Sequence, residues 1–238
     1  MFKKIAIIGS SGAIGSAFVD LYSKIHSIET IYSFSKTEKQ FSSNKVESFY
    51  IDIEDEDSIN NAAKKIGNQK LDMVIVATGI LHNKDFSPEK SIKDLDPEIF
   101  LKVLRINTVG PAIVGKHFLP LLGKNKKSVF AFLSARVGSI SDNTLGGWHA
   151  YRSSKSALNQ IVKNFSIEVK RSNPTAIVLA LQPGTVESKF SEPFKKNVPK
   201  DKLFSPEYSV SLLSKVIENA NQADSGNLLS YDGKVISP

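Results

Sequence analysis

The chain has 238 residues, of which 41% are hydrophobic and 23% charged, and its net charge at pH 7 is +7. It has no cysteine, which excludes disulfides and thiol nucleophiles, and its four histidines lack metal-ligand spacing, so we assign no metal. Its dispersed lysines indicate a solvated surface rather than a nucleic-acid interface. No apolar run approaches the ~18 residues of a membrane span or the length of a signal peptide, so we expect a soluble cytoplasmic protein that does not bind a membrane.

Short apolar runs alternate with amphipathic segments along the chain. In chain order the sequence predicts a strand at 3–9, a helix around 18–25, strands at 30–35 and 47–53, a helix at 57–66, a strand at 71–79, a long helix from Pro97 to about 122, a strand at 128–134, a helix around 158–169, a strand at 176–184, a helix from about 206 and a short strand at 227–233. Apolar strands that alternate with helices are typical of a parallel sheet covered on both faces. We therefore expect one doubly wound α/β domain over residues 1–238, with a mostly parallel seven-stranded sheet.

A glycine-rich turn follows the first predicted strand. It reads GSSGAIG, with Gly9, Gly12 and Gly15 three residues apart. Glycines allow a tight turn, close approach of a pyrophosphate and close packing of helix on strand, while the helix N-terminus supplies N–H donors. No lysine followed by serine or threonine closes the turn, which argues against a triphosphate-binding loop. We expect dinucleotide binding here, the alternative being a glycine-rich turn of an ordinary α/β domain.

The residues after the second predicted strand bear on the choice of dinucleotide. About 20 residues past the glycines, an NAD site usually has an acid for the ribose 2′-hydroxyl. Here the sequence has Ser35, followed by Lys36. A hydroxyl and an ammonium suit a 2′-phosphate, so we expect NADP(H) to be favoured over NAD(H). The alternative is that Lys36 is a solvated loop lysine.

Taken together, seven motifs resemble those of the short-chain dehydrogenase/reductase superfamily over essentially the whole chain. They are the glycine turn, Asp52-Ile53, ATG at 77–79, Asn107, a serine closing the fifth strand, YRSSK at 151–155 and PGTV at 183–186. The stretch LSARVGSISDNTLGGWHAYRSSKSALN further resembles the C-factor and sniffer-type carbonyl reductase branch. The chain departs from the superfamily in its three-and-three glycine spacing and in ATG, which replaces the usual Asn-Asn-Ala-Gly.

The resemblance implies a single Rossmann domain and a set of cofactor contacts. Asp52 is expected at the adenine, and residues 183–186 on the nicotinamide amide side. The implied contacts are Gly9, Ser11, Gly12, Ala13, Ile14, Gly15, Ser35, Lys36, Asp52, Ile53, Ala77, Thr78, Gly79, Asn107, Tyr151, Lys155, Pro183, Gly184, Thr185 and Val186.

The same resemblance assigns catalytic roles to Tyr151, Lys155 and Asn107. The tyrosine would protonate a carbonyl oxygen as hydride reaches the carbon, and the lysine would lower the tyrosine pKa and hold the nicotinamide ribose. Asn107 would shape its helix and support a water path to the lysine. The alternative is that Tyr151 and Lys155 are a polar pair on the wet face of a helix, since one helical turn brings any i and i+4 positions together.

The serine of the family's site is displaced by one position in this chain. The family serine usually stands three residues before a glycine, and in FLSARVG that position is Ala135. Ser134 lies one position earlier, and neighbours in a regular strand face opposite sides. We expect Ser134 to contribute as a catalytic residue through a twisted strand end. The alternative is that Ser134 only closes the strand.

We expect an NADP(H)-dependent oxidoreductase that acts on a small carbonyl or alcohol substrate, with a substrate loop at about 187–207. The resemblance also implies a homodimer or homotetramer. A second hypothesis is a cofactor-binding signalling or regulatory protein of C-factor type with little turnover. Modification of nucleotide sugars is disfavoured, because the large C-terminal substrate domain of those enzymes has no counterpart in this sequence.

Overall fold

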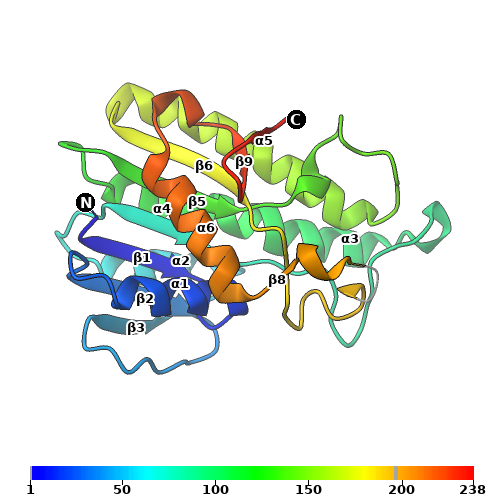
Figure 1. Ribbon diagram of the computed structural model, residues 1–238, viewed down its shortest axis with the longest axis horizontal. Coiled ribbons are helices and arrows are strands. Elements are labelled where there is room, and N and C mark those ends of the chain that lie inside the picture. Colours follow the sequence, from blue (N-terminus) through cyan, green and yellow to red (C-terminus); the bar gives the residue numbers. More distant parts are fainter. Residues whose placement is uncertain (1, 196–197) are drawn as a thin grey trace.

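A computed structural model describes residues 2–195 and 198–238 of the chain, without the side chain of Lys200. Within these residues, helices cover both faces of one large sheet (Figure 1). The sheet has eight strands in the order β10-β9-β6-β5-β4-β1-β2-β3. Their bounds are β1 Lys4–Ile8, β2 Thr30–Ser35, β3 Val46–Tyr50, β4 Met73–Val76, β5 Ser128–Leu133, β6 Ala176–Gln182, β9 Leu228–Ser230 and β10 Val235–Ile236.

The sheet confirms the predicted single α/β fold. Seven of the eight strands in this sheet run parallel, as expected, and β10 adds an antiparallel edge strand that pairs with β9. The connection between β9 and β10 turns at Gly233, whose φ is +83°. Such a positive φ favours glycine, because a side chain clashes with the backbone there.

The described part of the chain contains six α-helices, most of which pack on the sheet. They are α1 Ala13–Ser23, α2 Glu56–Lys64, α3 Pro97–Leu104, α4 Gly110–Phe118, α5 His149–Ser172 and α6 Pro206–Asn219. Asp55, Asp96 and Ser205 begin three of them, each accepting hydrogen bonds from backbone N–H groups of the first turn. None of the described helices combines the length and the apolar character that crossing a bilayer requires.

The predicted helix from Pro97 to about 122 is interrupted in its middle. A π-helical segment, η2 (Arg105–Val109), joins α3 to α4, and a 3-10 turn, η3 (Leu119–Leu121), ends the run. Single π-turns inside α-helices often occur at functional sites. This one contains Asn107, a predicted site residue.

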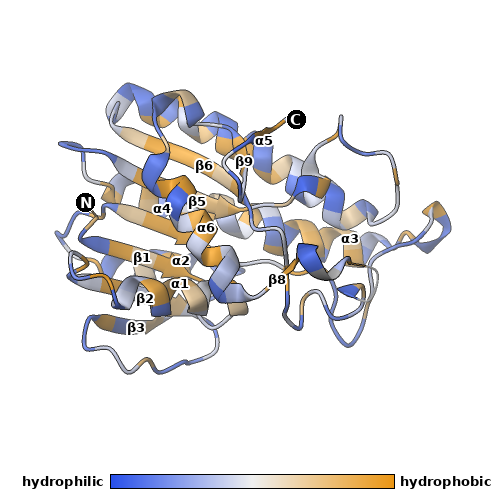
Figure 2. Cartoon of the chain, in the orientation of Figure 1, coloured by the Kyte–Doolittle hydropathy of each residue, from blue (hydrophilic) through white to orange (hydrophobic). Residues whose placement is uncertain are grey.

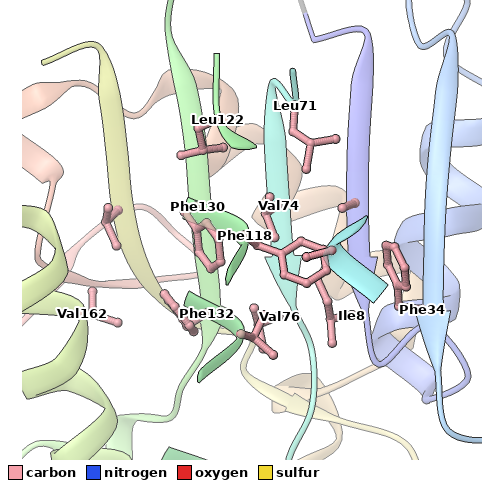
Figure 3. Close-up of a cluster of buried hydrophobic side chains, with 14 of the residues drawn as sticks. Ile8, Phe34, Leu71, Val74, Val76, Phe118, Leu122, Phe130, Phe132 and Val162 are labelled. Carbon is pink, nitrogen blue, oxygen red and sulfur yellow. The ribbon is translucent and has the colours of Figure 1, made fainter. Parts of the chain in front are cut away.

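Alternate residues of the strands point into two separate cores. Ala6 and Ile8 of β1 face the core under α2, α4 and α5, whereas Ile5 and Ile7 face the core under α1 and α6. Phe118 and Phe130 lie in the first core (Figure 3). Strands β1, β5 and β6 are mostly apolar along their length, while the helices carry polar residues on their outer sides (Figure 2).

Four of the predicted strands extend two or more residues too far at their carboxyl ends, and three of these run into predicted site residues. The strands expected at 47–53, 71–79 and 176–184 end at Tyr50, Val76 and Gln182. The excess residues, which include Asp52, ATG, Pro183 and Gly184, leave the sheet and form connections. In an open parallel sheet, ligands bind at these carboxyl ends.

Candidate active site

The turn after β1 depends on two of its three glycines for its own structure. Gly9 has φ +87°, and a β-carbon there would lie 2.9 Å from the carbonyl carbon of Ala77. Its N–H donates to the Phe34 carbonyl over 2.8 Å. A β-carbon on Gly15 would overlap the Gly9 carbonyl oxygen. Gly9 therefore allows the turn to pass close to β4, and Gly15 allows α1 to pack against the turn.

Gly12 differs from the other two glycines because it faces open space. It is the N-cap of α1, and no described side chain caps this helix. A β-carbon on Gly12 would meet only the Gly9 carbonyl oxygen, at 3.4 Å, and Ser11, Gly12 and Ala13 are exposed while Ile14 is half-buried. A free helix N-terminus attracts anions through its N–H groups and its dipole. The turn thus fits a pyrophosphate.

The ends of β2 and β3 bring two predicted cofactor contacts together. The Lys36 ammonium lies 2.6 Å from an Asp52 carboxylate oxygen, and this ion pair raises the pKa of Lys36. Burial alone would raise the pKa of Asp52, but the hydrogen bonds from Lys36 and from the Glu54 N–H lower it below its ordinary value. Ser35 is buried, and its hydroxyl donates to the Thr37 carbonyl over 2.7 Å. In this arrangement Lys36 is engaged by Asp52.

Lys39 is a second cation here, and the sequence reasoning missed it. Its ammonium donates to the hydroxyl of Ser16 in the first turn of α1 and lies 5.5 Å from the centre of the Phe41 ring. It stands in the irregular connection between β2 and β3, where no periodicity marks one lysine as different from its neighbours. Only the fold brings Lys39 to the beginning of α1.

The ATG segment after β4 lies between the glycine turn and Lys155 of α5. The Ala77 N–H donates to the Ile8 carbonyl over 2.7 Å. The Thr78 hydroxyl oxygen is buried and has no hydrogen-bond partner among the described residues. A buried polar atom without a partner is costly, so a ligand that supplies one is favoured here. This orphaned hydroxyl fits a bound dinucleotide.

Asn107 ties the π segment to the chain after β4 and to α5. Its side-chain oxygen accepts from the Ile80 N–H over 2.7 Å, and its amide nitrogen donates to the Ile80 carbonyl over 2.8 Å and to the Ser154 hydroxyl over 3.0 Å. A β-carbon on Gly79 would lie 3.3 Å from the Asn107 oxygen and 3.6 Å from the Lys155 ammonium. Gly79 therefore lies next to the side chains of both Asn107 and Lys155.

Tyr151 and Lys155 lie on the inner face of α5. Both are buried, with 7% and 3% of their surfaces exposed, so they are not a pair on the wet face. The Lys155 ammonium lies 5.8 Å from the centre of the Tyr151 ring and donates to the Leu133 carbonyl over 2.9 Å. Burial raises the pKa of Tyr151 and lowers the pKa of Lys155 to about 8. The phenol is therefore protonated at neutral pH.

The Ser134 hydroxyl is not directed at Tyr151. It donates to the Asn159 side-chain oxygen over 2.7 Å, and Asn159 lies two helical turns beyond Tyr151 on α5. Ala135 is extended, with φ −153° and ψ 149°, so its methyl group faces the opposite side from Ser134. This geometry favours the alternative in which Ser134 does not donate to the substrate.

The PGTV segment after β6 contacts α6 through Pro183 and the Phe204 ring through Gly184. The Pro183 carbonyl accepts from the Ser209 hydroxyl of α6 over 2.7 Å. Gly184 has φ +78°, and a β-carbon there would lie 2.7 Å from the Phe204 ring. Thr185 and Val186 form the short strand β7 (Thr185–Val186), which pairs with β8 (Leu203–Phe204). The predicted loop at 187–207 follows directly, and its residues 196–197 lie outside the described part of the chain.

Aromatic side chains around Tyr151 were also missed from the sequence. The rings of Trp148 and Phe190 lie edge-on to the Tyr151 ring, with centroids 6.3 and 5.9 Å away. Trp148 is only three residues before Tyr151, which is a signal that could have been used. Phe190 belongs to an irregular loop, and only the tertiary structure places it here.

Comparison with known proteins agrees with this fold. The family model described as short chain dehydrogenase matches residues 3–199. The chain therefore belongs to the short-chain dehydrogenase family, and it is an oxidoreductase of that family.

The individual similarities are moderate in identity but extend over most of the chain. An uncharacterized oxidoreductase of Schizosaccharomyces pombe is 29% identical over 203 residues, 80% of this chain and 78% of that protein. The C-signal protein of Myxococcus xanthus is 30% identical over 143 residues, 60% of this chain and 81% of that protein, in line with the C-factor branch. The NADPH-bound carbonyl reductase from chicken fatty liver has the same fold, with a TM-score of 0.85, 22% identity and 99% of each chain covered.

Proposed function

We propose that the protein is an NADP(H)-dependent reductase of small carbonyl compounds, with Tyr151 as the general acid. The observation that carries this proposal is the arrangement of Asn107, Tyr151 and Lys155. All three side chains are buried, and Asn107 and Lys155 both approach Gly79 at the carboxyl edge of the sheet. Buried titratable groups with shifted pKa values at such an edge are typical of an active site.

Three features support a nicotinamide dinucleotide as the cofactor. They are the free N-terminus of α1, the orphaned Thr78 hydroxyl and two cations, Lys36 near the end of β3 and Lys39 near the start of α1. A carbonyl reductase of the same fold is described as NADPH-bound. Residues 9–15, Thr78, Lys155 and residues 183–186 would hold the cofactor, which supplies a hydride when bound.

The proton in this reaction comes from the tyrosine. Burial keeps the Tyr151 phenol protonated, and it donates that proton to the substrate carbonyl oxygen, which becomes an alcohol. The Lys155 ammonium, charged below about pH 8, stabilises the phenolate that is left and can return a proton to it. Asn107 holds Ile80 and Ser154 in place and so maintains the shape of the pocket beside Lys155.

The test compares Tyr151→Phe with the native protein in NADPH oxidation against a panel of aldehydes and ketones. We expect turnover to fall by about 10²- to 10⁴-fold, while NADPH titration shows unchanged affinity. Tyr208→Phe is the matched control, since Tyr208 is 53% exposed on α6. Native turnover by Tyr151→Phe would refute the assigned role.

The similarity to C-signal favours a second candidate, a signalling or regulatory protein that binds the cofactor with little turnover. The same titration and assay separate the two candidates. Tight NADPH binding without tyrosine-dependent turnover on any carbonyl compound would support the second.

We also propose that residues 187–207 form the substrate loop and that the protein is a homodimer or homotetramer. The support for assembly is two exposed apolar side chains on the α3–η2 helical run, Leu101 and Val109, with 60% and 52% of their surfaces exposed. Light scattering after size exclusion measures the state directly, and a monomer at micromolar concentration would contradict it.

A further inference from the structure

A short segment after β7 covers the Tyr151 ring. We call residues Glu187–Lys195 the aromatic lid, because Phe190 and Phe194 point from it toward the start of α5. The Phe190 ring lies edge-on to Tyr151 at 5.9 Å, and the Phe194 ring lies 5.0 Å from that of Trp148. The contacts of Phe190 with Tyr151 and of Phe194 with Trp148 place both rings on the side of the lid that faces α5.

The lid is a compact turn held by Ser191. This side chain is 3% exposed, and its hydroxyl donates to the Val186 carbonyl over 2.6 Å and accepts from the Ser188 N–H over 3.2 Å. The Phe194 N–H and the Lys195 N–H both donate to the Ser191 carbonyl. The lid is therefore one compact turn that is anchored to β7 at Val186.

His82 joins the lid to the rest of the protein. Its Nε2 lies 3.1 Å from the Lys189 carbonyl oxygen and 3.0 Å from the Phe190 carbonyl oxygen, across more than 100 residues of sequence. Carbonyl oxygens only accept hydrogen bonds, so Nε2 carries the proton and donates to them. The His82 and Phe190 rings lie 6.5 Å apart.

The loop that carries His82 is itself anchored at both ends. Asn107 holds the N–H and the carbonyl of Ile80, two residues before His82. Glu89, which is 6% exposed, accepts from the Trp148 N–H at its backbone carbonyl over 2.6 Å and from the Ala150 N–H at its carboxylate over 3.2 Å. One loop thus binds the backbone at Trp148 and Ala150 and also contacts the lid at Lys189 and Phe190.

We propose that His82 is a positioning residue that holds the aromatic lid closed over Tyr151, and that Phe190 thereby selects flat, uncharged aromatic carbonyl substrates. The proposal rests on the function proposed above. A substrate carbonyl that reaches the Tyr151 hydroxyl comes close to the Trp148 and Phe190 rings, which both lie edge-on to the Tyr151 ring. Aromatic rings reward a flat apolar partner, whereas a charged group loses hydration there.

The first test follows the lid without any substrate. Trp148 is the single tryptophan of the chain, so its emission and its quenching by acrylamide report how far Phe194 covers it. We expect His82→Ala to raise the quenching constant about twofold or more, because the lid loses a hydrogen bond that is worth about five- to tenfold in the closed-to-open ratio. His82→Gln keeps an N–H donor and should restore most of the protection. His26→Ala, an exposed histidine on another connection, should equal the native protein.

The second test uses benzaldehyde and hexanal as probe substrates. We expect His82→Ala to raise the KM for benzaldehyde about fivefold with kcat nearly unchanged, and Phe190→Ala to reduce the preference for benzaldehyde over hexanal about two- to tenfold. In the first test, equal quenching constants for His82→Ala and the native protein would overturn the positioning role of His82. This holds even if turnover is shown to depend on Tyr151. Unchanged preference in Phe190→Ala would overturn the selection. If neither aldehyde is reduced by native protein, the proposed function fails, and the quenching test still decides the role of His82.

Discussion

The Lys36 ammonium and the Asp52 carboxylate form an ion pair of 2.6 Å at the carboxyl ends of β2 and β3. The Lys36 side chain is 61% exposed, whereas that of Asp52 is 19% exposed. An ion pair with one exposed partner contributes little to stability, because water screens it. A phosphate that competes for Lys36 therefore has only a weak interaction to displace.

The first prediction concerns the choice of cofactor. NADPH should bind more tightly than NADH, and Lys36→Asp should reverse that order. A charge-assisted contact to the 2′-phosphate is worth roughly 1.5–3 kcal/mol, or about ten- to hundredfold in the dissociation constant. Calorimetric titration of both cofactors measures it, and equal dissociation constants in the native protein would contradict the assignment.

Lys39→Ala should also weaken the binding of NADPH, but by less than Lys36→Asp does. The Lys39 ammonium already reaches Ser16 at the beginning of α1, close to where the dinucleotide is expected. NADPH affinity should fall several-fold while NADH affinity stays the same. Lys24→Ala is a suitable control, because Lys24 is exposed at the opposite end of α1. Equal loss for both cofactors would remove Lys39 from the phosphate site.

Another prediction separates binding from folding at the glycine turn. Gly12→Val should abolish cofactor binding with little loss of stability, since its β-carbon would meet only one atom, at 3.4 Å. Gly9→Val should destabilise the fold by several kcal/mol, because Gly9 has φ +87° and touches Ala77. Thermal unfolding and NADPH titration of both variants provide the measurements. Unchanged affinity in a folded Gly12→Val protein would show that the turn does not hold the phosphates.

Stability should depend on pH through Lys155. Burial lowers its pKa to about 8 from 10.5, so between these values the unfolded chain binds more protons than the native protein. The free energy of unfolding therefore rises with pH across this window. The native protein should gain up to about 3 kcal/mol relative to Lys155→Met. Urea unfolding at both ends of the window tests this, and an unchanged difference between the two proteins would contradict it.

The last prediction concerns the serine position. Ser134→Ala should reduce stability by about 1 kcal/mol through loss of its hydrogen bond to Asn159, with little effect on turnover. Ala135→Ser should raise turnover, since one oxyanion donor is worth up to 10²- to 10³-fold. Both variants are assayed on the best substrate found. A large loss of turnover in Ser134→Ala would reinstate Ser134 as a catalytic donor.

Much of the fold could be predicted from local pattern alone. The strands of β2 and β5 were located to within one residue, because buried parallel strands are apolar along their whole length. The glycine turn could also be predicted from the sequence, since its spacing and its place between a strand and a helix are both local features. Strand ends were harder to predict from the sequence, because the apolar run continues into Ala77 or Ile53 after the backbone has left the sheet.

The orientations of side chains were decided by the tertiary structure. The sequence identifies Tyr151, Lys155 and Asn107 by motif, but burial of the first two depends on strands and loops far away in the chain. Ser134 turns toward Asn159 because β5 stays regular to its end, which no local pattern reveals. The contacts of His82 with the aromatic lid join segments more than 100 residues apart. Such contacts depend on the path of both loops, and loop conformation has no periodicity from which it can be read.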